Sequence, residues 1–226
     1  MSTLAHVFEA AGMSTIALGS IRKQIESTAA PRGLWCDFPL GRPLGKPGDP
    51  DFQQRVLKAA FALLDSPEPV ITAFDESIPD DGEEMLACPL PPRHDPNAHP
   101  AIDEARGLRA AYDRGVEMSK GRIAAGRVVQ ADDIPAAIEA FIRIAEGTPW
   151  DEAGIPGLPM RVSQDVRGYY ETAALAMVDH APPAWAGIRW FLDATETGKI
   201  LMAARKEMER QEAPQPMWFY LTPGDR

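Results

Sequence analysis

The feature that most restricts the fold is a proline-rich segment in the first half of the chain. Eight prolines lie between Pro67 and Pro100, together with the acidic run DESIPDDGEE. Dense proline with few apolar residues does not favour a regular core element, because proline lacks the amide donor. We therefore expect an extended arm over residues 66–102, lying across the surface or across a partner subunit. The arm would separate an α/β unit, residues 1–65, from a helical region, residues 103–226, packed on that unit in one compact domain.

The first sixty-five residues alternate between helical and strand patterns. Leu4, Val7 and Phe8 repeat at helical spacing, MSTIALGS is typical of a short buried strand, IRKQIEST of a second helix and LWCDF of a second strand. Two strands joined by a helix are most simply parallel, with a right-handed crossover. The expected fold class is α/β: a small parallel sheet with an N-terminal helix–strand–helix–strand unit, then the proline-rich arm and a mainly helical C-terminal half.

Several later helices are signalled by their ends and by their spacing. Asp49 is placed to cap a helix that has Pro50 in its first turn. After the arm, DEARGLRAAYDRGVEM predicts one helix, and a longer helical pattern runs from AWAGIRW to KEMERQ. Gly198 weakens this last pattern, so we expect a kink or a break near it. The closing MWFYL is typical of an edge strand.

The sequence places glycine, proline and positive charge together directly after the second expected strand, in CDFPLGRPLGKPG. Ligands of parallel sheets gather beyond the carboxyl ends of the strands. Glycine lets backbone N–H groups approach an anion, and arginine and lysine supply charge for a carboxylate or phosphate. A plain structural turn is the alternative, because glycine and proline are ordinary turn residues. The residues predicted to bind the ligand are Ser20, Arg22, Asp37, Gly41, Arg42, Gly45 and Lys46.

The same loop does not match the phosphate-binding motif of nucleotide hydrolases. That motif needs four residues between its glycines and a Ser or Thr after the lysine. Here three residues separate Gly41 from Gly45, and Pro47 follows Lys46. Nucleotide hydrolysis is therefore disfavoured.

Cys36 is the only candidate near this loop for covalent chemistry. A cysteine nucleophile needs a cationic or helix-N-terminal setting, and the adjacent carboxylate of Asp37 works against it. Free cysteines are more often small core residues. Cys88 lies in the proline-rich arm and is the weaker candidate.

Charge and composition exclude several classes of protein. A formal net charge of −10 argues against a general nucleic-acid binder and against docking on anionic membranes. Two cysteines are too few for a disulfide scaffold, and no apolar run approaches the roughly 18 residues of a membrane span. His94, Asp95 and His99 lack the spacing of a zinc site. We expect a cytoplasmic protein with reduced thiols and with neither metal nor cofactor.

Two stretches resemble the selenoprotein B component of the glycine, sarcosine, betaine and D-proline reductases. FEAAGMSTIAL is similar to that family's E-x-A-G-I-P-T/V-V segment, and FPLGRPLGKPGDPDFQQRVLKAAFALL is similar to its P-H-P-L-G-N-P loop with the following helix. Their order and spacing agree over about sixty residues, and no match extends beyond Asp65. The resemblance implies a small amine-containing substrate and, for an enzyme, reductive cleavage of a C–N bond.

The chain departs from this family at its redox centre. The family's reactive selenocysteine or cysteine lies just before this region, whereas residues 1–11 contain no cysteine, and Phe38 stands where the family has histidine. Either the scaffold has lost the reductase chemistry or the redox residue lies upstream of Met1. We expect no glycine or proline reductase activity from this chain alone.

Three hypotheses about function follow. The first is a reductase-related protein that binds a small anionic, amine-containing molecule at the loop after the second strand. The second is a non-catalytic subunit or assembly partner of a reductase-like complex, and the third is a cofactor-independent lyase or hydrolase that uses the helical half. We also expect a homodimer in which the arm or the C-terminal segment crosses between subunits, because two strands alone leave open sheet edges.

Overall fold

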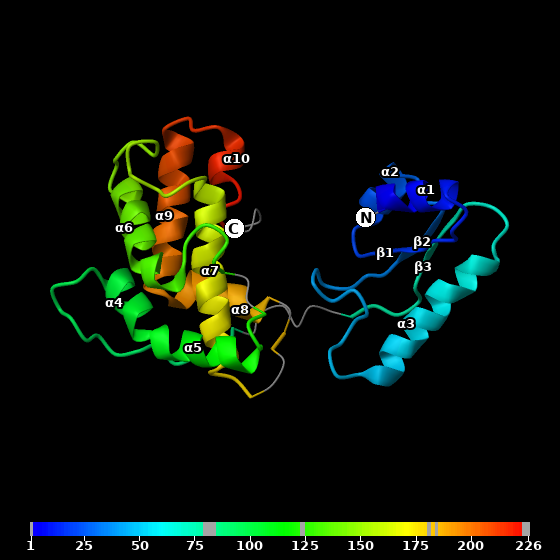
Figure 1. Ribbon diagram of the computed structural model, residues 1–226, viewed down its shortest axis with the longest axis horizontal. Coiled ribbons are helices and arrows are strands. Elements are labelled where there is room, and N and C mark those ends of the chain that lie inside the picture. The colour runs from blue at the N-terminus through cyan, green and yellow to red at the C-terminus, as the bar shows by residue number, and fades with distance from the viewer. Residues whose placement is uncertain (1, 79–84, 123–124, 180–181, 184, 223–226) are drawn as a thin grey trace. The chain divides into compact units, whose positions relative to one another are not determined.

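The chain folds into two compact units, which are described separately (Figure 1). The sheet unit comprises Met1–Glu84 with Pro183–Trp185, and the helical unit comprises Met85–Pro182 with Ala186–Arg226. The structure is a computed structural model, and it describes residues 2–78, 85–122, 125–179, 182–183 and 185–222.

The sheet unit contains a three-stranded parallel sheet in the order β1-β2-β3. Leu34 in the central strand pairs with Leu18 on one side and with Thr72 on the other. Helices α1 and α2 lie on one side of the strands, and α3 lies on the other (Figure 1). The elements in chain order are α1 (Ser2–Ala10), β1 (Ala17–Gly19), α2 (Arg22–Ser27), β2 (Arg32–Trp35), α3 (Pro50–Ala62), the 3-10 turn η1 (Leu63–Asp65) and β3 (Val70–Ala73).

Small residues in the strands let α2 lie close to the sheet. A Cβ atom at Gly33 would come within 2.7 Å of Ile25 Cγ2, so a larger residue would push α2 away. On the opposite face Leu34 packs with Phe52 and Val56 of α3, and these side chains form the core of the unit. The crossover from β1 through α2 to β2 is therefore held by packing on both faces.

The expected α/β class and the helix–strand–helix–strand order are confirmed. The start of α3 also follows the local signal. The Asp49 carboxylate accepts the N–H of Phe52 at 3.0 Å, and Pro50 occupies the first turn. Short-range capping chemistry was sufficient to locate this helix.

The expectation that residues 66–102 form an extended surface arm with no regular core element is wrong in part. Val70–Ala73 forms strand β3, which pairs with β2 as the third strand of the sheet. These four residues contain no proline and include three β-branched side chains, which suit a strand between flanking turns. Later in the same range, Leu86 and Cys88 are buried in the core of the helical unit. Residues 79–84 of the acidic run lie outside the described residues.

The helical unit has a core of fully buried side chains that include Phe141, Tyr170 and Leu201. In the described part of the chain, no helix combines the length and the apolar character needed to cross a bilayer. The elements are α4 (Pro100–Gly107), α5 (Arg109–Met118), the 3-10 turn η2 (Ala131–Asp133), α6 (Ile134–Ala145), α7 (Pro159–Leu175), α8 (Ala186–Arg189), the π-helical turn η3 (Trp190–Ala194), α9 (Glu196–Arg210) and α10 (Gln215–Trp218).

Two expected helices are divided in the structure. The segment predicted as one helix forms α4 and α5, which meet at Leu108. The long C-terminal pattern breaks at Thr195, which is extended and caps α9 through its hydroxyl, so the break expected near Gly198 is confirmed. A Cβ atom at Gly198 would lie 1.9 Å from the carbonyl oxygen of Phe191, so glycine is needed where α9 passes the π-helical turn.

The expected edge strand at MWFYL is wrong. These residues form the end of α10 and the turn after it. The indole of Trp218 donates to the carbonyl of Ala213 at 3.1 Å, the guanidinium of Arg205 lies over the rings of Trp218 and Phe219, and Leu221 is fully buried. Packing within the helical unit therefore overrides the strand propensity of this aromatic run.

The contact between α5 and α7 gives a stability prediction. A Cβ atom at Gly115 would lie 2.0 Å from the backbone oxygen of Thr172, which a side-chain rotation cannot relieve. Gly115→Ala should lower the free energy of unfolding by about 1–3 kcal/mol, because overpacking outweighs the gain in helix propensity. Gly187→Ala is the matched control, since a Cβ atom there has nothing within 4 Å. Urea unfolding curves that place Gly115→Ala at or above the control would contradict this packing.

Candidate functional site

The predicted ligand loop begins where β2 ends, at the carboxyl edge of the parallel sheet. The N–H of Cys36 donates to the carbonyl of Gly19 at 3.0 Å, and the carbonyl of Asp37 accepts the N–H of Ile78 at 3.2 Å. The start of the loop is therefore held between the end of β1 and the segment that follows β3. In parallel sheets this edge is the usual place for a ligand.

Two successive turns shape the middle of the loop. The N–H of Arg42 donates to the carbonyl of Pro39 at 3.1 Å, and the N–H of Gly45 donates to the carbonyl of Arg42 at 2.9 Å. Gly41 and Gly45 both have φ of +87°, which favours glycine. A Cβ atom at Gly45 would also lie 2.3 Å from Phe52 Cε1. A residue without a side chain is therefore needed where the loop passes the first turn of α3.

The cationic side chains of the predicted site have different surroundings. Arg22 Nε lies 2.7 Å from a Glu26 carboxylate oxygen, and its guanidinium lies 5.4 Å from the ring centre of Trp35. The indole N–H of Trp35 in turn donates to the carbonyl of Ser20 at 3.2 Å. The side chain of Lys46 is exposed. The structure thus brings Ser20 and Arg22 together around Trp35, a residue that the motif analysis did not single out.

The backbone of Lys46 is held by a hydrogen bond from α3, and Arg42 is half-buried in the turn before it. The carbonyl of Lys46 accepts the side-chain N–H of Gln53 at 2.9 Å, which ties the end of the loop to α3. Asp37 is exposed at the start of the same loop. The loop therefore presents cations and one carboxylate from a backbone that is hydrogen-bonded at both ends.

Cys36 lies in the core of the sheet unit. Its exposed fraction is 1%, and it packs in the cluster that contains Leu34 and Phe52. Burial raises the pKa of the Cys36 thiol to about 11, so the reactive thiolate is scarce at neutral pH. Cys88 is also buried, and burial raises its pKa. Both surroundings are those of structural thiols.

The helical unit has a buried polar centre that sequence reasoning missed. The carboxylate of Glu104 accepts the hydroxyl of Tyr170 at 2.8 Å and the N–H groups of Glu196 and Thr197 at 2.9 and 3.2 Å. Burial raises the pKa of Tyr170 well above its ordinary value, so the phenol keeps the proton that it donates. The Thr197 hydroxyl oxygen lies 2.6 Å from the Tyr170 oxygen and 3.3 Å from the carbonyl oxygen of Ala101.

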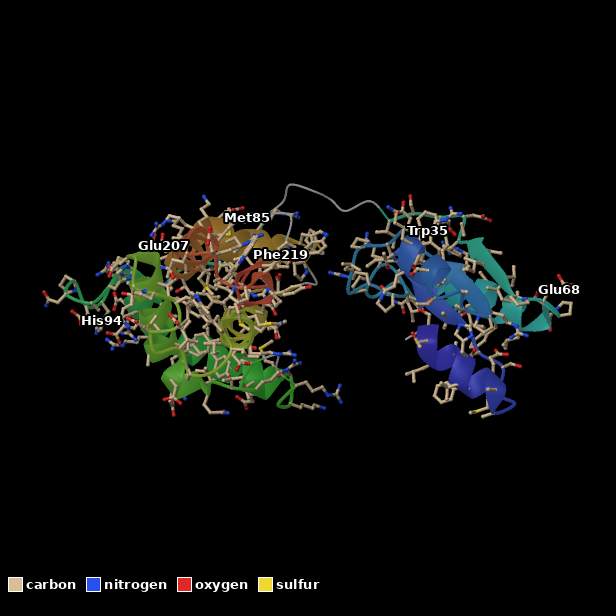
Figure 2. The ribbon with its side chains drawn as sticks, turned by 90° about the horizontal axis from the view of Figure 1, so that it is seen from above. Trp35, Glu68, Met85, His94, Glu207 and Phe219 are labelled. Atoms are coloured by element: carbon tan, nitrogen blue, oxygen red, sulfur yellow. The ribbon has the colours of Figure 1, made fainter. Side chains whose placement is uncertain are left out.

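A second buried carboxylate, Asp103, organises the segment with the predicted histidines. It accepts the N–H groups of His94 and Asp95 at 2.8 and 3.1 Å, and Arg93 Nε lies 3.1 Å from it. The hydrogen bond from His94 is the largest of the contacts that hold the pKa of Asp103 below its usual value. His94, labelled in Figure 2, lies in the loop before α4, and the ring of His99 accepts the N–H of Ala101 at the start of that helix.

These contacts give the histidine segment a structural role. Among the residues that the structure describes, no group of three or more histidine, cysteine, aspartate or glutamate side chains is placed to hold a metal ion. A third buried carboxylate, Asp165, similarly accepts the N–H groups of Arg127, Val128 and Val129 at 2.7–3.1 Å. The buried acids of this unit thus fix backbone loops and the start of α9.

Comparison with models of known protein families, with curated proteins and with solved structures found no match to this chain.

The burial of Cys36 predicts a slow thiol. In a Cys88→Ser variant, which isolates it, Cys36 should react with iodoacetamide far more slowly at pH 7.5 than in the unfolded chain. Its rate should rise about tenfold per pH unit up to about pH 11, because the thiolate fraction does so below the pKa. Mass spectrometry of timed samples measures this rate. Rapid labelling of the folded protein at neutral pH would show that the thiol is activated.

Proposed function

We propose that this protein binds a small anionic, amine-containing molecule at the loop 37–46 of the sheet unit. The observation that carries the proposal is the position of this loop, which leaves the central strand at the carboxyl edge of a parallel sheet. Arg42 and Lys46 supply positive charge for the anionic group, and the exposed carboxylate of Asp37 supplies an acceptor for the amine. The resemblance to selenoprotein B components supports an amine-containing ligand of this size.

The proposal assigns binding, and not covalent catalysis, to this site. A reductase of the resembled type needs a thiol or selenol that can attack its substrate. Cys36 is buried, and its raised pKa keeps it protonated at neutral pH. Residues 1–11 contain no other cysteine. The bound molecule would therefore be held by this chain, and any reductive step would need a reactive group from another chain or another segment.

The charge of the loop can be tested by substitution. Arg42→Ala/Lys46→Ala should abolish the binding of acetate, glycine and phosphate probes, because each charge-assisted contact contributes about 1.5–3 kcal/mol. Isothermal titration of the purified chain measures the affinity. Lys23→Ala/Lys58→Ala is the matched control, since both lysines are exposed on helices of the same unit and removing them makes the same change in net charge. Equal probe affinities in the two double variants would mean that the loop is only a turn.

A second candidate function, a subunit that assembles through the sheet unit, is favoured by the surface of α1. Leu4, Val7 and Phe8 lie at helical spacing, and their exposed fractions are 50%, 61% and 43%. Ser2 and Ala5 of the same helix are buried. An exposed apolar face of this kind is characteristic of an interaction surface. We propose a second copy of this chain as its partner, because two-fold pairing is the commonest symmetric arrangement.

The structure changes the reason for expecting a dimer. Leu221 is buried in the helical unit and Met217 and Trp218 pack against its core, so these residues do not need a partner to bury them, whereas Tyr220 stays exposed. Light scattering at low micromolar concentration should give about twice the chain mass if α1 pairs with its copy. Val7→Glu should then give monomers, because the new charge would be buried in the contact. Ala10→Glu, which adds the same charge outside the apolar set, should leave the dimer intact; a wild-type monomer would exclude this candidate.

A further inference from the structure

The helical unit contains a cavity that is separate from the loop site. Its volume is about 480 Å³, within the range typical of small-molecule sites. Its walls come from α4, α5, η2, α6 and α7, which all belong to one unit. Ile102, Ala105 and Pro135 give it a partly apolar lining, while the ring of Tyr169 is 2% exposed and its hydroxyl donates to the Ala105 carbonyl. The lining thus offers apolar contacts and few neutral polar groups.

One of the two arginines of the cavity already pairs with two carboxylates. Arg109 Nε lies 2.9 Å from an Asp113 carboxylate oxygen, and its Nη1 pairs with the carboxylate of Asp132, which also lines the cavity. Glu139, at the α6 wall, has Arg143 3.7 Å away. The three lining residues Arg109, Asp132 and Glu139 therefore have partners of opposite charge before any ligand enters.

Arg106 is the exception in this lining. It lies at the end of α4 with its side chain exposed, and among the described residues the structure shows neither an ion pair nor a hydrogen bond for its guanidinium. A guanidinium presents paired N–H donors that match the two oxygens of a carboxylate. Ile102 and Pro135, which are partly exposed in the same lining, offer apolar surface to a compact hydrocarbon group.

Charge balance selects among anions. Arg109 with its two carboxylates carries a net charge of about −1, Glu139 and Arg143 cancel, and Arg106 contributes +1. The surroundings are therefore close to neutral, and a second negative charge on a ligand would face Asp132 without compensation. This arrangement favours a monoanion over a dianion.

We propose that this cavity binds a small monocarboxylate with an apolar body, with the carboxylate on Arg106 and the body against the Ile102, Ala105 and Pro135 wall. The site is independent of the loop 37–46. It lies in the other unit, and it selects its ligand by an apolar body and a single negative charge rather than by an amine.

Benzoate is a suitable probe, with benzamide as its neutral counterpart and phthalate as a dianion. In NMR titrations of the full chain, benzoate should cause saturable shifts of amides that line the cavity. Benzamide and phthalate should bind several-fold more weakly. Arg106→Gln should weaken benzoate about tenfold, as the loss of one charge-assisted contact predicts. Ala136→Phe, a substitution at an exposed residue of the wall, should block the cavity and abolish the shifts.

Two controls make the result specific. Arg114→Gln makes the same change of charge at an exposed residue of α5 that does not line the cavity, so benzoate affinity should be unchanged. The Arg42→Ala/Lys46→Ala variant should also bind benzoate normally, which separates this site from the loop. The proposal is overturned if benzoate causes no saturable shifts, if benzamide binds equally well, or if folded Arg106→Gln, checked by circular dichroism, binds like Arg114→Gln.

Discussion

The helical unit depends on one buried carboxylate, that of Glu104. It joins α4 to the hydroxyl of Tyr170 on α7 and to two backbone N–H groups at the start of α9. Those N–H groups have no partner within their own helix, and a negative charge is favourable at a helix N-terminus. Glu104 thus satisfies groups that would otherwise be costly to bury. Because Arg106 follows two residues later on the same helix, the contact that holds α4 in place also positions the cationic end of the cavity.

The sheet unit depends instead on close packing across a narrow sheet. Gly33 lets α2 approach one face, while Leu34 and Phe52 close the other. Cys36, directly after β2, packs in the same core as Leu34 and Phe52. The chain therefore buries the Cys36 thiol at the point where it leaves β2 and enters the loop at the carboxyl edge of the sheet. The same geometry therefore favours ligand binding at the surface of the edge and disfavours a nucleophile beneath it.

The features that local chemistry determines could be predicted from the sequence. The cap at Asp49, the parallel order of the first two strands and the break near Gly198 each depend on neighbours along the chain. The features that the sequence did not predict depend on residues elsewhere in the chain. Strand β3 forms because β2 offers an edge. MWFYL forms the end of α10 and the following turn, because the contacts of Arg205 with Trp218 and Phe219 and the burial of Leu221 outweigh its strand propensity. Glu104 and Thr197 are 93 positions apart, so no local pattern indicated their contact.

We propose above all that the loop 37–46 is a ligand site and not only a turn. The most direct measurement is an NMR titration of the ¹⁵N-labelled chain with glycine and acetate, following the backbone amides of Gly41 and Gly45. Gly41 lies in the turn that ends at Arg42, and Gly45 ends the second turn directly before Lys46. Ligand binding at the loop should give saturable shifts at these amides, larger than those on α2 or α3, and no covalent adduct at Cys36. Amides that do not respond, or shifts spread evenly over the unit, would contradict it.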